Sequence, residues 1–205
     1  MILRVMKRQI VAIHGGTSFD TYEDYISFIK TRELTLERLA QCDDWKASLG
    51  KELGEGFEVL WPKMPNGTNA RYAEWSLWFG RCALLLQDSV VLIGHSLGGI
   101  FLAKYLSEHD FPRNIKATCL VAAPFDGVST VESLNDFALP ASLQTLEAQG
   151  GQIYIVHSQD DPVVPYAEMA KYQAALPKAQ PMVFEDRGHF NQDSFPELTA
   201  LIRSL

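Results

Sequence analysis

The sequence SVVLIGHSLGG (residues 89–99) joins an apolar run to a turn flanked by glycines. Val90–Ile93 is apolar and mostly β-branched, which predicts a buried strand, and a helical pattern follows the turn. Gly94 and Gly98 let the chain bend sharply, because glycine adopts backbone conformations that a Cβ would block. A serine held between a strand and a helix in this way, with its hydroxyl exposed, is typical of a nucleophile elbow. The stretch therefore predicts that Ser96 is a nucleophile.

Strand-like and helix-like segments alternate along the whole chain. The expected strands are Gln9–His14, Phe57–Trp61, Ser89–Ile93, Lys116–Ala122, Gln152–His157 and Pro181–Glu185. The expected helices are Tyr22–Lys30, Asp43–Leu53, Ala70–Leu86, Ile100–Ser107, Ala141–Gln149, Tyr166–Leu176 and Phe195–Leu205. This alternation predicts an α/β fold with a mainly parallel six-stranded sheet, right-handed crossovers and helices on both faces. Pro181 favours an edge position for the last strand, because proline cannot donate to a neighbouring strand.

Composition is that of one globular domain, residues 1–205. The formal net charge is −7 and no basic stripe is present, which argues against nucleic acid as a partner. No apolar run approaches the length that crosses a membrane, so we expect no membrane segment.

The cysteines and the missing metal motifs bear on compartment and cofactors. Cys42, Cys82 and Cys119 form no CxxC pair, which disfavours a disulfide framework or a zinc site and favours a reducing cytoplasm. Cys119 lies inside an expected strand, which predicts burial. The chain has no HExxH motif and no aspartate cluster at metal spacing, so we expect neither a metal nor an organic cofactor.

Polar residues follow four of the expected strands. Because ligands of open α/β sheets bind at the carboxyl ends of the strands, these residues are expected to lie close together. A serine hydroxyl needs a histidine to take its proton, and the histidine needs a carboxylate to orient it. Asp160 and Asp161 follow the fifth strand, Asp126 follows the fourth, and His189 is the only histidine after all three. The order predicts a catalytic triad of Ser96 and His189 with one of these carboxylates.

Structural interpretations stand beside the catalytic ones. Asp161 precedes Pro162, a place where aspartate often caps a helix. His157 ends an expected strand, which favours a structural hydrogen bond. His95 lies within the turn itself, and its side chain is expected beside the site.

Three segments resemble those of α/β-hydrolases: GHSLGG around Ser96, SQDDPVVP around Asp161 and RGHF around His189. With the short chain, they are similar to one small branch, the minimal serine hydrolases that include retinoblastoma-binding protein nine and bacterial relatives. The resemblance extends over residues 14–205 and implies a compact α/β-hydrolase fold with a minimal cap. In the pattern D-x-x-V-P of this family, the catalytic acid corresponds to Asp161.

The resemblance also implies an oxyanion hole. In such hydrolases the loop after the first strand gives one backbone N–H, and the residue after the nucleophile gives the other. Gly16 and Leu97 are the corresponding residues here. The alternative for Gly15 and Gly16 is a plain turn, and a phosphate loop is disfavoured because the GxGxxG and GKS/T patterns are absent.

Three further segments bear on the shape of the site. Residues 124–151 are expected to form a small cap, which would leave the site shallow and favour short acyl chains. Residues 19–56 are longer than the family pattern demands, and the alternative to a shallow site is that their aromatic residues fold over it: Tyr22, Tyr25, Phe28 and Trp45. In the expected helix 70–86, four aromatic residues share a face, which predicts core packing: Tyr72, Trp75, Trp78 and Phe79.

Together these features predict a serine hydrolase that cleaves small carboxylic esters or related acyl compounds through a covalent acyl-enzyme. The alternative is a non-catalytic member of the same fold that binds protein partners. The complete set of serine, acid and histidine favours the enzyme, since a binding role would tolerate loss of Ser96 or His189.

Overall fold

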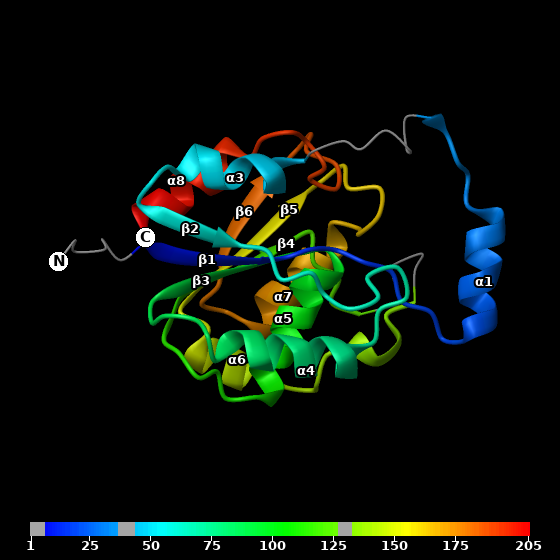
Figure 1. Cartoon of the computed structure of the whole chain (residues 1–205), viewed down its shortest axis with the longest axis horizontal. Helices are drawn as coiled ribbons and strands as arrows, with labels where there is room; N and C mark the ends of the chain where they lie inside the picture. Colours follow the sequence, from blue (N-terminus) through cyan, green and yellow to red (C-terminus); the bar gives the residue numbers. More distant parts are fainter. Residues whose placement is uncertain (1–6, 37–43, 127–132) are drawn as a thin grey trace.

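Six strands form one parallel sheet. The computed structural model describes residues 7–36, 44–126 and 133–205, and Figure 1 shows the strands side by side. The strands are β1 (Arg8–Ile13), β2 (Phe57–Leu60), β3 (Val90–His95), β4 (Ile115–Val121), β5 (Gln152–Ser158) and β6 (Gln180–Phe184). They pair in the order β2-β1-β3-β4-β5-β6, so the prediction of a parallel sheet with the last strand at an edge is confirmed.

Helices cover both faces of this sheet (Figure 1). One face carries α4 (Tyr72–Ala83), α5 (Leu97–Glu108), α6 (Gln144–Gln149) and α7 (Ala167–Ala175), and the other carries α3 (Trp45–Leu53) and α8 (Pro196–Ser204). Side chains of a strand alternate between the faces. In β1, Val11 and Ile13 therefore join the core under α4 and α5, whereas Ile10 and Ala12 join the core under α3 and α8.

The turn at Ser96 has the backbone expected of a nucleophile elbow. Ser96 is the only residue between β3 and α5, and its φ of 56° is rare for a residue with a Cβ. The turn also needs close contact between backbones. A Cβ on Gly94 would lie 2.3 Å from the carbonyl oxygen of Gly98, and one on Gly98 would lie 2.5 Å from that of Ile13. Only glycine fits at both positions.

Two helices are shorter than expected, and one aromatic residue lies elsewhere. α4 spans Tyr72–Ala83 instead of residues 70–86, and α6 also begins later than predicted. Trp75 and Phe79 are fully buried and Tyr72 packs against the same core, but Trp78 is 41% exposed. The prediction for Trp78 was wrong because it lies about 100° of helical rotation from Phe79, outside the apolar stripe.

Residues 19–56 divide into two helices with different surroundings. α1 (Tyr22–Thr31) has no buried residue and stands apart from the sheet and the other helices (Figure 1). Its aromatic residues Tyr25 and Phe28 contact Phe19. α3, by contrast, packs on α8 and buries Trp45. Residues 37–43, which include Cys42 and the expected helix start Asp43, lie outside the described part of the chain.

The described part of segment 124–151 contributes side chains to the hydrophobic core on one face of the sheet. Phe137 of the short helix η1 (Asn135–Phe137) and Leu146 of α6 are fully buried in the core under α4 and α5. Residues 127–132 of the expected cap are not among the described residues.

Two further expectations concern the membrane and the cysteines. None of the helices in the described ranges is long and apolar enough to span a membrane.

Cys119 is buried in β4, as predicted, and burial raises the pKa of its thiol to about 12.

The close packing at the turn predicts that Gly98→Ala is strongly destabilising. The new methyl group would overlap the carbonyl oxygens of Ile13 and His14. We expect a loss of about 1–3 kcal/mol in the free energy of unfolding, measured by urea denaturation. Gly56→Ala is the control, because its Cβ would meet no atom within 4 Å. Equal stability of the two variants would contradict the packing argument.

Candidate active site

Loops from five strand ends meet at one edge of the sheet. Four of them line a single pocket: Gly16 follows β1, Ser96 follows β3, Pro124 follows β4 and Val163 follows β5. The fifth loop follows β6 and carries His189. Parallel strands bring this about, because all their carboxyl ends lie at the same edge.

Asp161 and His189 contact each other directly. Nδ1 of His189 lies 2.9 Å from Oδ2 and 3.1 Å from Oδ1 of Asp161. The carboxylate is buried, and its Oδ1 also accepts the backbone N–H groups of Val163 and Val164, which fix its orientation. An ionised carboxylate only accepts hydrogen bonds, so Nδ1 of His189 carries the proton. Nε2 is thereby left available to act as a base.

The two rival carboxylates are engaged elsewhere. Asp126 forms an ion pair with Lys171 at 2.7 Å. Asp160 is exposed and accepts hydrogen bonds from the Ser158 hydroxyl and from the backbone N–H of Gly188. Of the three carboxylates considered from the sequence, Asp161 is the one that the structure places against His189.

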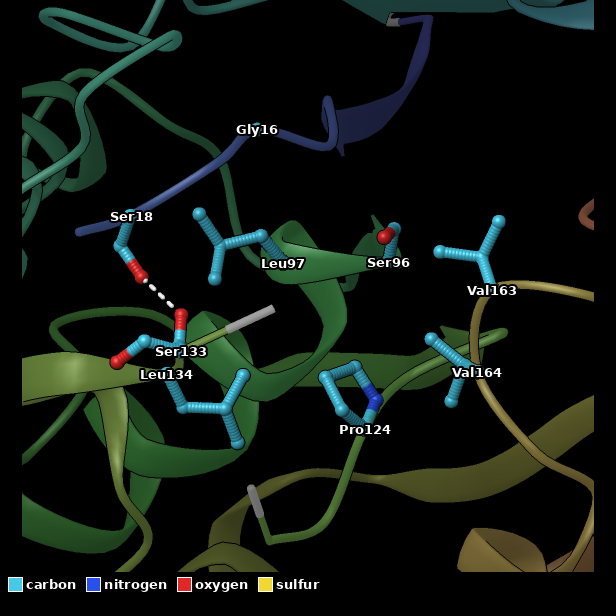
Figure 2. A pocket seen from close by; sticks show the side chains of 9 residues that line it. All are labelled: Gly16, Ser18, Ser96, Leu97, Pro124, Ser133, Leu134, Val163 and Val164. Atoms are coloured by element: carbon cyan, nitrogen blue, oxygen red, sulfur yellow. Dashed lines mark hydrogen bonds between the residues drawn. The ribbon is translucent and has the colours of Figure 1, made fainter. Parts of the chain in front are cut away.

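The hydroxyl of Ser96 lies at the pocket (Figure 2). In the part of the chain that the structure describes, no hydrogen bond joins this hydroxyl to His189. The ring of His95, the residue before the serine, lies with its centroid 5.0 Å from that of the His189 ring. A hydrogen bond between a nucleophile and its base often tightens only when a substrate binds.

Gly16 and Leu97 lie where two N–H donors are expected. The N–H of Gly99 is paired with the Ser96 carbonyl, but Leu97 stands at the first position of α5 and has no partner in the preceding turn. Gly16 lines the same pocket. A Cβ on Gly16 would lie 2.5 Å from the carbonyl oxygen of Gly67, so this loop also requires glycine.

Two further histidines help to shape the site: His95, which the sequence places beside it, and His14, to which the sequence assigned no role of its own. His14 accepts the backbone N–H of Met64 at Nε2 and donates from Nδ1 to the carbonyl oxygen of Gly15 at 2.6 Å, which fixes the Gly15–Gly16 loop. His95 donates from Nε2 to the carbonyl oxygen of His189 at 2.8 Å. Burial lowers the pKa of His95 well below its ordinary value, so its ring stays neutral. The sequence signal for both roles is position, since His14 precedes the Gly15–Gly16 loop and His95 directly precedes Ser96.

His157 has the structural role that its place at a strand end predicts. It is fully buried, and its Nε2 donates to the carbonyl oxygen of Val164 at 2.9 Å. Burial lowers its pKa. The bond ties the turn that carries Asp161 to β5.

A narrow pocket opens beside Ser96 (Figure 2). It is lined by Gly16, Ser18, Ser96, Leu97, Pro124, Ser133, Leu134, Val163 and Val164. Its cavity volume of about 20 Å³ holds little more than one water molecule. At one end the Ser18 hydroxyl donates to the carbonyl oxygen of Ser133 at 2.7 Å, as the dashed line in Figure 2 shows. The described residues of α1 contribute nothing to its walls.

The groups around the pocket suit proton transfer. Within residues 7–36, 44–126 and 133–205, no group of three or more His, Cys, Asp or Glu side chains is placed to hold a metal ion. Nearby, the imidazole of His189 contacts the buried carboxylate of Asp161, a pair that can move a proton. Gly16 and Leu97, whose backbone N–H groups are the expected oxyanion donors, line the pocket.

Comparisons with known proteins agree with this arrangement. Residues 40–201 match the family model described as serine hydrolase. The chain is 30% identical to the serine hydrolase RBBP9 of Rattus norvegicus over 158 residues. This alignment covers 76% of this chain and 82% of the relative. The chain belongs to the serine hydrolase family.

Solved structures resemble this serine hydrolase over almost its whole length. The ydeN gene product of B. subtilis has a TM-score of 0.76 at 20% identity, with 97% of this chain and 98% of that chain covered. Est1E from Butyrivibrio proteoclasticus has a TM-score of 0.61 at 16% identity, with 98% and 87% covered. The α/β-hydrolase fold predicted from the sequence is therefore confirmed.

Proposed function

We propose that this serine hydrolase cleaves small carboxylic esters through a covalent acyl-enzyme. Ser96 is the nucleophile, His189 the base and Asp161 the carboxylate that orients the base. The contact of 2.9 Å between Nδ1 of His189 and Asp161, beside the strained turn of Ser96, carries the proposal. It leaves Nε2 as the ring nitrogen that takes the serine proton.

The reaction follows from these roles. Oγ of Ser96 attacks the ester carbonyl carbon while its proton passes to Nε2 of His189. The N–H groups of Gly16 and Leu97 stabilise the negative charge that develops on the carbonyl oxygen. His189 then gives the proton to the departing alcohol, and a water molecule releases the acyl group from Ser96 by the same two proton transfers. Neither a metal ion nor an organic cofactor takes part.

The pocket is the proposed site of the acyl group. His189 protonates the leaving alcohol, so the alcohol must depart on the side of His189. The pocket lies instead beside Gly16 and Leu97, the two oxyanion donors, and His189 is not among its lining residues. Its walls are largely apolar, with Leu134 among them. Its small volume supports short acyl groups, as the sequence also predicts.

The role of Ser96 is tested with a fluorophosphonate probe. We expect the wild-type protein to be labelled and Ser96→Ala to be unlabelled, with turnover of p-nitrophenyl acetate reduced on the order of 10³-fold or more. Ser107→Ala is the matched control, since Ser107 lies in α5 and donates to the carbonyl of Ala103. Circular dichroism checks that both variants fold. Equal labelling of Ser96→Ala would remove the proposal.

The role of the acid is tested by two isosteric changes. Asp161→Asn is expected to lower kcat by about 10²–10⁴-fold, because His189 loses the anion that orients it. Asp126→Asn removes a partner of Lys171 away from His189 and should leave kcat near that of the wild type. If Asp126→Asn were the crippling change and Asp161→Asn harmless, the acid would follow β4 instead.

The acyl pocket predicts a preference for short chains. With p-nitrophenyl esters, we expect acetyl to butyryl groups to be cleaved at least as well as octanoyl. Leu134→Ala should enlarge the pocket and raise kcat/KM for hexanoate relative to acetate, by up to about fourfold for each methylene buried at about 0.8 kcal/mol. Leu85→Ala is the control, because Leu85 is 83% exposed beyond α4. A wild-type kcat/KM that climbs steadily to decanoate would contradict this assignment.

A further inference from the structure

The loop that carries His189 has an unusual backbone on both sides of the histidine. Gly188 has φ 50° and Phe190 has φ 54°. The left-handed conformation of Phe190 is strained because this residue, unlike glycine, has a Cβ. Its side chain is fully buried. A strained conformation persists only where the surrounding structure holds it, and the loop therefore needs contacts from outside.

Helix α3 supplies such contacts just after the histidine. The indole Nε1–H of Trp45 donates to the carbonyl oxygen of Phe190 at 2.9 Å, and the backbone N–H of Trp45 donates to that of Gln192 at 2.7 Å. One turn later, Oγ of Ser48 lies 3.1 Å from the carbonyl oxygen of Asp193, but its single proton has a closer acceptor in Oε1 of Glu52 at 2.7 Å. The two N–H groups of Trp45 are therefore the donors by which α3 holds this loop, at Phe190 and Gln192.

Trp45 also supports the contact at the histidine itself. His95 donates to the carbonyl oxygen of His189, and the indole ring of Trp45 packs edge-on against the His95 ring, with centroids 6.3 Å apart. Trp45 is buried, so water does not compete for these contacts. The indole therefore contacts both the residue after His189 and the histidine that holds its carbonyl.

We propose that Trp45 is a positioning residue for His189. Through its two N–H donors and its contact with His95, it fixes the loop so that Nδ1 of His189 meets Asp161. This inference rests on the proposed role of His189 as the base. It gives α3, which lies within the stretch matched by the family model, a part in the reaction rather than a place over the substrate.

Trp45→Phe is the direct test, because phenylalanine keeps an apolar ring but removes the indole N–H. We expect kcat for p-nitrophenyl acetate to fall by about 10- to 100-fold, as for a misplaced catalytic group, with KM within about twofold. We expect the wild type to give a low-field NMR resonance from the His189 Nδ1–H, and this resonance should broaden or vanish in Trp45→Phe. Trp78→Phe, on the exposed side of α4, is the matched control and should change neither.

Three outcomes separate this inference from the proposed function. If Trp45→Phe retains kcat and the resonance while His189→Ala loses probe labelling, Trp45 has no positioning role and the proposed function stands. If His189→Ala is labelled as fast as the wild type, both fail. If Trp45→Phe does not fold, Trp45→Met carries the test, because methionine fills apolar space flexibly and also lacks the indole N–H. The same loss of about 10- to 100-fold in kcat is expected, and an unchanged kcat and resonance in that variant would overturn the role of Trp45.

Discussion

The close approach of α5 to the sheet is the constraint on which the site depends. It is possible because Gly94 and Gly98 leave room for backbone against backbone, with distances of 2.3 and 2.5 Å from their absent Cβ atoms to carbonyl oxygens. The chain therefore turns from β3 into α5 through Ser96 alone, at a φ of 56°. Strain of this kind costs about 1–3 kcal/mol and is tolerated because the flanking strand and helix are buried. The same turn brings Ser96 and Leu97 to the wall of one pocket.

Parallel topology then brings the other groups to that turn, and short-range bonds make their loops rigid. Asp161 is fixed by the N–H groups of its own turn, and His157 ties this turn to β5. Asp160, the neighbour of Asp161, holds the loop of His189 through the N–H of Gly188. Adjacent aspartates thus do different work: one faces the histidine and the other holds the backbone that carries it. Loops supported in this way can keep the precise geometry that general base catalysis needs.

The sequence predicts the sheet, its edge strand and the turn at Ser96, because each rests on local chemistry: apolar runs, a proline and closely spaced glycines. The choice among Asp126, Asp160 and Asp161 was not determined by local chemistry, since all three follow strand ends, and only the resemblance favoured Asp161. The contact between Trp45 and Phe190 spans 145 positions in the chain, so no local pattern could reveal it. Helical spacing wrongly predicted that Trp78 lies in the core. Trp78 follows the buried Trp75 by three residues, a step that falls short of a full helical turn and leaves its side chain exposed.

The central claim is that hydrolysis proceeds through an acyl group on Ser96. The most direct measurement is rapid mixing with p-nitrophenyl acetate, followed by acid quenching and peptide mapping by mass spectrometry. The account predicts a burst of p-nitrophenol approaching one equivalent per chain and an acetyl group on the peptide that contains Ser96. Steady turnover with neither burst nor adduct, even when deacylation is slowed by low temperature, or an acetyl group that maps to another residue, would contradict it.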